Sequence, residues 1–318
     1  MVKRWLGGLF LAVSASVAGA ASFPERPVNL VVPYSPGGLT DQLARLYADR
    51  LSKVWDQPVV VENRPGAGSS IGAAYVARSK PDGHTVLLGS VGMVTNAMML
   101  PSMPYKTEEL TPLTRLAVAP NVLYVHSSVP ATNVQELVDY AKKNPGSLSF
   151  ASSGVGSSPH LAAELFAAKT GIDVIQVPYK GTGAAIADFL GGQVNAYFDT
   201  MQSMRYTKDG SIRALAVTTT ERLKEAPDLP TIEESGVASG VISGSWFGIF
   251  VPSDVPAKTQ TQLEQAFNQI ASDPAVQEEV AKLGLIPDHQ PQQAFKAFIE
   301  SETEKWGDVI RTQNIRIQ

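Results

Sequence analysis

The chain has no cysteine and only four histidines among its 318 residues. Without cysteine it can form neither disulfides nor thiolate metal sites, so its hydrophobic core alone must hold it together. The histidines lie far apart, and none has a second histidine three or four positions away, as a helical metal site would need. We therefore expect no metal site and no cofactor.

Long hydrophobic runs are also lacking, except at the N-terminus. There Lys3 and Arg4 precede a short apolar run, Leu6 to Val17, and Ala18-Gly19-Ala20 forms a small-residue cleavage site. This is the pattern of a secretory signal peptide. A membrane anchor is the alternative, but the run is short for a transmembrane helix and no cysteine follows it to carry a lipid. We expect an exported protein cleaved near Ala20.

Basic residues are not in excess. The expected signal peptide holds two of the 26 basic residues and none of the 30 acidic ones, so the remaining 298 residues carry a net charge of −6. Nucleic-acid-binding proteins usually present a basic face, so this balance argues against a nucleic-acid partner. A chain of this length can bury a substantial core and favours two domains over one.

What the sequence does contain is a strand followed by a helix, repeated along the chain. Apolar runs and helical periodicity predict strands at 28–34, 58–62, 85–89, 148–151, 174–177, 195–198 and 213–218, and helices at 41–55, 70–78, 159–169 and 184–190. Continuous apolar strands alternating with amphipathic helices are typical of an α/β fold, in which helices cover both faces of a parallel sheet. Two such groups indicate two lobes.

Two extended apolar segments lie between these groups, Leu116–His126 and Ser245–Val251. Each is followed by a turn that contains proline, and we expect both to cross between the lobes. The tail, residues 257–311, has helical periodicity with a polar outer face, and we expect it to be helical.

Four of the strand-to-helix junctions are rich in glycine and serine: residues 35–40, 65–70, 152–160 and 179–184. The first N–H groups of a helix have no partner within the helix, and the helix dipole makes that end partly positive. Small residues let an anion approach these donors. Each junction alone is explained by ordinary turn chemistry. Four together, at the ends of parallel strands, predict a binding site for a small anionic molecule.

Three polar residues beside these junctions are candidates for ligand contacts. His160 lies in the first turn of a helix, where it would either hydrogen-bond the preceding loop or donate to a bound carboxylate. Asp199 follows a strand as a turn former or a polar contact at the cleft. Arg205 would bind a second, distal carboxylate, or would simply be an exposed arginine.

Two motif matches are weaker. Gly68-Ser69-Ser70-Ile71-Gly72 fits the G-x-S-x-G pattern of serine hydrolases, with Asp254 and His289 available downstream. That motif needs its serine on a sharp turn at a strand end, whereas Pro65-Gly66-Ala67 lengthens this junction into a loop. A loosened dinucleotide fingerprint, also beginning at Gly66, lacks the acidic residue that should end the next strand.

Six blocks of the chain, in this order and at this spacing, resemble the substrate-binding proteins of the tripartite tricarboxylate transporters, also called the Bug family. The blocks are "FPERPVNLVVPYSPGGLTDQLAR" (23–45), "VVENRPGAGSSIGAAYVARSKPDGHTVLLG" (60–89), "SFASSGVGSSPHLAAELF" (149–166), "VPYKGTGAAIADFLGGQVNAYFD" (177–199), "IRALAVTTTERLKEAPDLPTIEESGV" (212–237) and "WFGIFVPSDVP" (246–256).

The resemblance implies a two-lobed α/β fold of the periplasmic-binding-protein type 2, or Venus-flytrap, kind, with two strands crossing between the lobes. We expect a signal peptide at 1–20, lobe 1 at 21–120 plus 243–318, and lobe 2 at 121–242. It also implies a periplasmic, monomeric receptor, not an enzyme, which closes on a small carboxylate and passes it to the membrane permease subunits of the transporter.

In the family, one carboxylate lies among the loops that match 34–40 and 153–160, with ordered water helping to bridge it. Combining this with the glycine-rich junctions, we expect the ligand to contact Tyr34, Gly37, Gly38, Leu39, Thr40, Ser70, Ser90, Gly156, Ser157, Ser158, His160, Tyr179, Gly181, Thr182, Asp199 and Arg205.

The sequence departs from the family where His-Ala-Ile-Asn-Pro often follows the third strand. Here Met93 stands at the His position, Asn96 is kept, and Met98 and Met99 follow. Methionine packs adaptably against flat rings, although these residues would equally fill the core of lobe 1. If they face the cleft together with Tyr179, Trp246 and Phe247, an aromatic mono- or dicarboxylate such as terephthalate becomes the expected ligand.

Two other functions remain open from the sequence. One is a secreted serine hydrolase that uses Ser70. The other is a sensor that presents its bound ligand to a signalling partner, because sensing and transport would use the same closed lobes.

Overall fold

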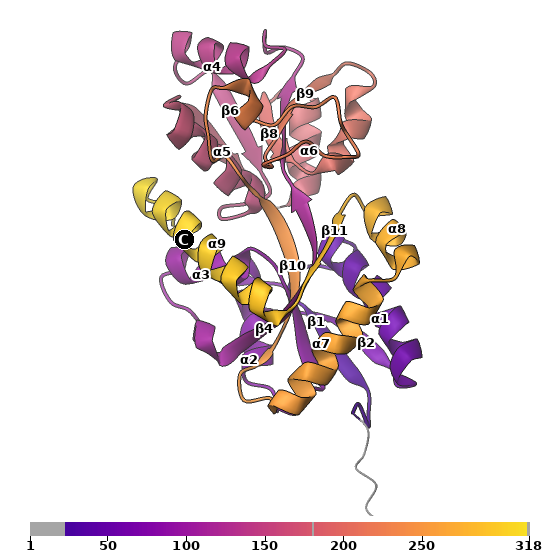
Figure 1. Ribbon diagram of the computed structural model, residues 1–318. Helices are drawn as coiled ribbons and strands as arrows, with labels where there is room; N and C mark the ends of the chain where they lie inside the picture. The colour runs from indigo at the N-terminus through magenta and orange to yellow at the C-terminus, as the bar shows by residue number, and fades with distance from the viewer. Residues whose placement is uncertain (1–22, 180, 317–318) are drawn as a thin grey trace, which may run out of the picture.

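Two β-sheets, each covered by helices on both faces, form the two lobes of the protein (Figure 1). The computed structural model describes residues 23–179 and 181–316. The expected signal peptide and Lys180, in the fourth glycine-rich junction, lie outside the described residues. We call the body around the six-stranded sheet lobe 1 and the body around the five-stranded sheet lobe 2. The expected α/β, two-lobed fold is confirmed.

The sheet of lobe 1 has the strand order β11-β4-β10-β3-β1-β2. Helices α1, α7 and α8 pack on one face of the sheet, and α2, α3 and α9 pack on the other. The strands are β1 (Val28–Val32), β2 (Val59–Asn63), β3 (Thr85–Gly89), β4 (Leu110–Pro120), β10 (Gly244–Pro252) and β11 (Ile286–Gln290). The helices are α1 (Leu39–Trp55), α2 (Ser70–Ala77), α3 (Gly92–Met99), α7 (Ala257–Ala271), α8 (Pro274–Lys282) and α9 (Gln292–Thr312).

The sheet of lobe 2 has the strand order β7-β6-β8-β5-β9. Helices α4 and α5 pack on one face, and α6 packs on the other. The elements are β5 (Val122–His126), α4 (Val134–Lys143), β6 (Leu148–Ser152), α5 (Ser158–Thr170), β7 (Val174–Pro178), α6 (Thr182–Leu190), β8 (Ala196–Asp199), the 3₁₀ helix η3 (Met201–Thr207) and β9 (Ile212–Val217).

The lobes are joined where β4 continues into β5 and where the chain returns from β9 to β10. Asn121 is the single residue between β4 and β5. Its backbone N–H donates to the Ser243 carbonyl at 3.3 Å, and its own carbonyl accepts from the Thr218 N–H at 2.9 Å. The two connections therefore run side by side at one narrow point, which we call the hinge. They correspond to the two crossing segments expected from the sequence.

The expected elements agree with the structure to within a few residues, with one exception in the tail. Residues 257–311 are not purely helical, because Ile286–Gln290 forms β11 and pairs antiparallel with β4. This segment contains Pro287, Asp288 and His289, and it lacks the alternating apolar pattern of a strand. Its strand conformation comes from pairing with a neighbour distant in sequence, which local periodicity does not reveal.

Candidate functional site

The carboxyl ends of the parallel strands in the two lobes point toward the hinge. β1, β2 and β3 are parallel to one another, and so are β6, β7 and β8. Asp199, the last residue of β8, pairs with Val122, the first residue of β5 beside the hinge. All four glycine-rich junctions follow these strand ends, so they lie on the sides of the lobes that face each other. We call them the cleft loops.

The cleft loops of lobe 1 are tied together by side chains. Asn96 donates to the Gly68 carbonyl at 2.7 Å and to Ser69 Oγ at 3.3 Å, joining α3 to the loop after β2. Burial raises the pKa of the Tyr34 phenol, while hydrogen bonds with the Ser69 and Ser90 side chains act in the opposite direction. Tyr34 therefore links the loops that follow all three parallel strands.

The N-terminus of α1 is open to an incoming anion. Gly38 is its N-cap and provides no side-chain hydrogen bond, and Leu39 and Thr40 form the first turn. Gly37 adopts φ +83°, a left-handed conformation that favours glycine. Its N–H donates to Asp41 Oδ2 at 2.9 Å, and Arg45 pairs with the same oxygen at 2.9 Å. Because Arg45 balances the Asp41 carboxylate, the negative charge nearest this helix end is neutralised.

Ser70 begins α2, and its side chain is almost fully buried. Its Oγ has no hydrogen-bond partner among the described residues. His289, the histidine considered for a hydrolase triad, instead contacts Ser272 at 3.4 Å. The geometry therefore gives no support to an exposed, histidine-activated nucleophile at Ser70. A buried hydroxyl without a partner fits a ligand or water contact better.

In lobe 2, the loop before α5 hydrogen-bonds mainly to itself. Ser157 Oγ donates to the Gly154 carbonyl at 2.6 Å, and the Gly156 N–H points at His160 Nδ1 at 3.4 Å. This geometry assigns the proton of the neutral imidazole to Nε2, which lies 4.0 Å from Glu164 Oε1. Burial lowers the pKa of His160 to about 4, so the ring is uncharged at neutral pH.

The remaining predicted residues of lobe 2 lie after β7 and β8. Tyr179 donates its hydroxyl to Asp188 Oδ2 at 2.9 Å, while Gly181, the N-cap of α6, and Thr182 begin a helix with no side-chain cap. Asp199 is buried and accepts from Ser203 Oγ at 2.5 Å, and burial raises the pKa of its carboxyl. Arg205 is exposed and donates to the Tyr206 hydroxyl at 2.7 Å.

The hinge has a polar centre that sequence reasoning missed. Asn121 Nδ2 donates to Ser158 Oγ at 2.9 Å and to Ser243 Oγ at 3.2 Å, so the first residue of α5 is tied to both connections. Thr218 Oγ1 donates to the Ser243 carbonyl at 2.7 Å. A signal for this centre was present in the sequence, because Asn121 interrupts an otherwise apolar crossing segment.

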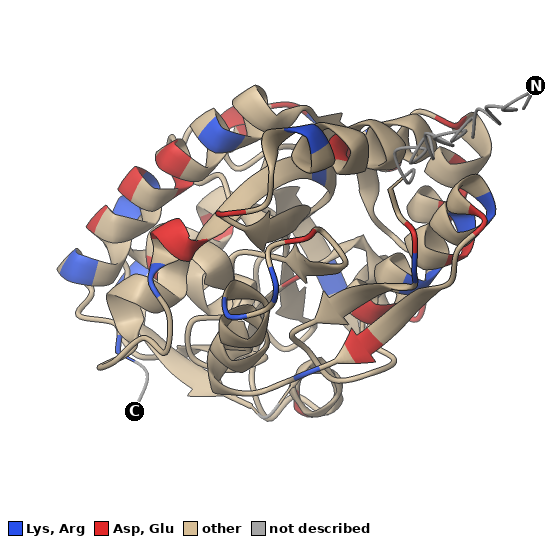
Figure 2. Cartoon of the chain, turned by 90° about the horizontal axis from the view of Figure 1, so that it is seen from below, with Lys and Arg blue, Asp and Glu red and all other residues tan. Residues whose placement is uncertain are grey.

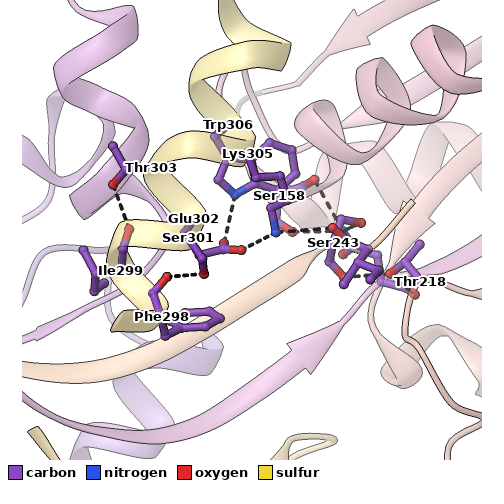
Figure 3. Close-up of polar contacts among 12 residues, drawn as sticks. Ser158, Thr218, Ser243, Phe298, Ile299, Ser301, Glu302, Thr303, Lys305 and Trp306 are labelled. Atoms are coloured by element: carbon purple, nitrogen blue, oxygen red, sulfur yellow. Dashed lines mark hydrogen bonds and ion pairs between the residues drawn. The ribbon is translucent and has the colours of Figure 1, made fainter. Parts of the chain in front are cut away.

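Helix α9 reaches this polar centre from lobe 1, as Figure 3 shows. Lys305 Nζ donates to the Ile242 carbonyl, next to Ser243, at 3.3 Å. The same ammonium pairs with buried Glu302, which also accepts from Trp306 Nε1 at 2.9 Å. One connection is therefore pinned to the last helix of lobe 1.

Of the three aromatic residues considered as ligand contacts, Tyr179 lies in a cleft loop, whereas Trp246 and Phe247 lie on β10. Trp246 and Phe247 are buried, on opposite faces of the lobe 1 sheet. Met93 is also buried, and its sulfur accepts from the Tyr105 hydroxyl at 3.9 Å. The condition under which an aromatic ligand was expected, that Met93, Trp246 and Phe247 face the cleft, gains no support from their burial. Both faces of a central strand are covered in this fold, so an aromatic residue there packs in the core.

Surface charge does not single out another kind of site. In the view of Figure 2, basic and acidic residues are interspersed along the outer helices. Within residues 23–179 and 181–316, no cluster of three or more His, Cys, Asp or Glu residues could hold a metal ion. No helix in the same ranges is both long and apolar enough to cross a membrane.

Comparison with known proteins agrees with this geometry. Residues 43–315 match the family described as tripartite tricarboxylate transporter family receptor, TctC. The chain belongs to this family. Protein BugT of Bordetella pertussis is 34% identical over 317 residues, which cover 98% of this chain and 97% of BugT. The proposed resemblance to Bug proteins is confirmed.

Solved structures of TctC-type receptors share the fold. Rpa4515 of R. palustris, solved with adipate, is 36% identical with a TM-score of 0.83, over 92% of this chain and 99% of that one. The periplasmic binding protein BugD is 32% identical with a TM-score of 0.79, over 93% and 100%. MatC of Rhodopseudomonas palustris, with bound malate, is 29% identical with a TM-score of 0.77, over 91% and 100%. This TctC receptor is therefore a solute-binding protein by family.

Proposed function

We propose that this receptor captures a small dicarboxylate in the periplasm by closing its lobes, and delivers it to the membrane permease of a tripartite transporter. This proposal rests on one observation: both lobes have helix N-termini without a side-chain cap on their cleft sides. These helices are α1 in lobe 1, and α5 and α6 in lobe 2. Two such ends can grip the two ends of a dianion with backbone N–H groups. The adipate and malate bound to Rpa4515 and MatC support the ligand class.

In this proposal lobe 1 holds the first carboxylate. Gly38, Leu39 and Thr40 present the N–H groups of α1, while Tyr34, Ser70 and Ser90 supply hydroxyls from the adjoining loops. Lobe 2 closes over the ligand with Gly156, Ser157, Ser158 and His160 from one loop, and Tyr179, Gly181 and Thr182 from the other. Asp199 orients a ligand hydroxyl or water, and Arg205 contacts a distal group.

The ligand body is proposed to be an aliphatic chain of the size of malate or adipate. The aromatic alternative, terephthalate, rested on methionine and aromatic side chains at the cleft. Met93, Trp246 and Phe247 are instead buried in lobe 1. Terephthalate is therefore the rival to be tested beside the aliphatic acids.

The moving units are proposed to be residues 21–120 with 243–318, and residues 121–242, in a monomer. Their boundaries fall at the polar centre of the hinge, where Asn121 and Ser243 join the two connections. Ligand that contacts both units stabilises the closed arrangement.

A thermal-shift screen of the mature protein against small carboxylates tests the proposal. A ligand at 100- to 1,000-fold excess over its dissociation constant should stabilise the folded state by about 3–4 kcal/mol. Malate, succinate, adipate and terephthalate form the core of the panel, with hexanoate as the matched monocarboxylate. If no dicarboxylate raises the melting temperature, the proposed ligand class is wrong.

Delivery and the absence of catalysis need separate measurements. Deleting the gene should abolish uptake of the identified ligand, whereas a pure sensor would leave uptake intact. Ester hydrolysis should be undetectable both in the natural protein and in the Ser70→Ala variant. Turnover that disappears in the variant would instead support the hydrolase.

A further inference from the structure

The lobes also touch on the side of the hinge that is opposite to the cleft loops. In lobe 1, β3, β1 and β2 lie on one side of the connecting strands β4 and β10, and β11 lies on the other. In lobe 2, β8, β6 and β7 lie on one side of β5, and β9 lies on the other. We call the side of β11 and β9 the rear edge. The segment Leu283–Ile286, which leads into β11, meets lobe 2 there.

Three observations place a close contact at the rear edge. Gln202 Nε2, from η3 of lobe 2, donates to the Leu283 carbonyl at 2.7 Å. A Cβ added at Gly284 would lie 2.8 Å from Gln202 Cγ, so the glutamine rests directly on the glycine backbone. Ile286 of lobe 1 packs against the core cluster of lobe 2. We call Gln202, Leu283, Gly284 and Ile286 the rear latch.

The position of the rear latch couples it to closure of the cleft. In lobe 1, β4 and β10 lie between β11 of the rear latch and the strands that carry the cleft loops. In lobe 2, Gln202 lies in η3, the segment that connects β8 to the rear strand β9. A rotation about the hinge that brings the cleft loops together therefore moves the rear edges apart. Among the described residues, no side-chain hydrogen bond joins the cleft loops of lobe 1 to those of lobe 2, whereas the rear latch is formed. This arrangement is the one with the cleft loops apart.

We propose that the rear latch holds the lobes apart and so sets the affinity of the receptor, with Gln202 and Gly284 as positioning residues. The inference rests on the proposed function, because it assigns the latch a role in capture of the same ligand. When only a fraction of the molecules is competent to close, the apparent dissociation constant rises in inverse proportion to that fraction. Weakening the latch should therefore tighten binding, although no ligand contact is added.

The rear edge is built to separate at modest cost. A surface hollow of about 420 Å³ lies beside the latch, between residues 219–225 of lobe 2 and Gln277, Ile286 and Pro287 of lobe 1. Gln202 itself is exposed, so a broken hydrogen bond is replaced by water.

The first test measures the lobe arrangement without ligand. The chain has no cysteine, so Asp49→Cys on α1 and Ala187→Cys on α6 give two unique sites for spin labels, both on the cleft side of the hinge. Gln202→Ala should shift the label distances toward shorter values and lower the dissociation constant for adipate about two- to tenfold. Gln135→Ala, which removes an exposed glutamine bonded within α4, is the matched control and should change neither. Unchanged distances in Gln202→Ala would overturn the proposal.

The second test locks the latch. Gln202 Cβ is one bond from the Cγ that lies 2.8 Å from a Cβ at Gly284, so the two Cβ positions fall within reach of the roughly 3.5–4.5 Å span of a disulfide. In Gln202→Cys/Gly284→Cys, the oxidised protein should bind adipate at least tenfold more weakly than the reduced protein. Equal affinity in the two redox states would contradict the latch. If adipate binds no form of the protein, the ligand assignment fails, and the ligand-free label distances still decide the latch.

Discussion

The cleft loops of lobe 1 are joined to one another, whereas those of lobe 2 form side-chain hydrogen bonds mainly within themselves. In lobe 1, Tyr34 and Asn96 connect residues from three successive loops. In lobe 2, Ser157 bonds its own loop and Tyr179 bonds the helix that follows it. Among the described residues, Ser158 does reach beyond its own loop, to Asn121 in the hinge.

This difference suggests how members of one receptor family can share a carboxylate-binding half and still bind ligands with different bodies. Loops that hydrogen-bond to one another lose little conformational freedom when a ligand binds, so we expect lobe 1 to hold the carboxylate that all dicarboxylates share. Loops that hold only themselves can adjust separately. Lobe 2 is therefore the half in which we expect adaptation to the body of the ligand.

The largest expected effect is at Gly38, because a side chain there would occupy the space in front of the α1 N-terminus. A Cβ at Gly38 lies 3.6 Å from the Ser35 carbonyl oxygen, an ordinary contact, so Gly38→Val should fold. We expect affinity to fall at least about 100-fold, or ~2.7 kcal/mol, by isothermal titration calorimetry. Gly183→Val in lobe 2, where an added Cβ meets nothing within 4 Å, should cost less than about tenfold. Equal losses of affinity in Gly38→Val and Gly183→Val would contradict the proposed difference between the two lobes.

The second effect concerns the pH dependence of stability in lobe 2. The folded-state pKa of His160, about 4, is below its unfolded value of about 6.5, so the stabilising neutral form is fully present above pH 6.5. Its contribution is lost as the pH falls toward 4, by about 3 kcal/mol in urea unfolding experiments. In His160→Gln, the unfolding free energy should fall less between pH 6.5 and pH 4. His126→Gln, at the outer end of lobe 2, is the control and should behave like the natural protein. Burial raises the pKa of neighbouring Glu164, which opposes the loss at low pH and is retained in both variants.

The third effect tests the cross-linking of lobe 1. Tyr34→Phe removes the hydroxyl shared with Ser69 and Ser90 and leaves their side chains with one partner fewer. We expect ligand affinity to fall about tenfold and the unfolding free energy to fall by about 1 kcal/mol. Tyr140→Phe on α4 is the control. A loss of affinity with unchanged stability would show that Tyr34 contacts the ligand without organising the loops.

The smallest effect is expected at Arg205 in lobe 2. Its guanidinium is exposed and stacks 4.6 Å over the ring of Tyr206. A contact between an exposed arginine and a distal carboxylate is screened by water and salt. Arg205→Met should therefore weaken dicarboxylate binding only about twofold. A matched monocarboxylate should bind both proteins equally, and a tenfold loss for the dicarboxylate would place Arg205 inside the closed cleft.

Local patterns predicted most of the strands and helices, because those elements are defined by neighbours in sequence, but they did not predict α3, α4 or β11. The expected strand 85–89 coincides with β3, and all four glycine-rich junctions connect a strand to a helix. Contacts between distant residues were not predictable in this way. Asn121 and Ser158 meet across 37 positions, and nothing local indicates that they share a hydrogen bond.

The orientation of side chains also could not be predicted from the sequence. Trp246 and Phe247 lie on a strand that is covered on both faces, so neither period nor composition distinguishes a core position from a cleft position. The same holds for Ser70, whose burial depends on how α2 packs against its neighbours. The roles of the cleft loops as ligand contacts stay predictions that the variants above will test.

The central position of β10 in lobe 1 has a consequence for how the chain matures. All five strands of lobe 2 lie between residues 122 and 217, but the lobe 1 sheet lacks the strand between β4 and β3 until residues 244–252 are added. Because the chain is synthesised from its N-terminus, all strands of lobe 2 are available before the lobe 1 sheet is complete. Until β10 is made, β3 and β4 each have an edge without its partner strand. Unpaired strand edges and exposed apolar faces are the features on which molecular chaperones act. We therefore expect lobe 1 to depend more than lobe 2 on chaperones during synthesis and folding.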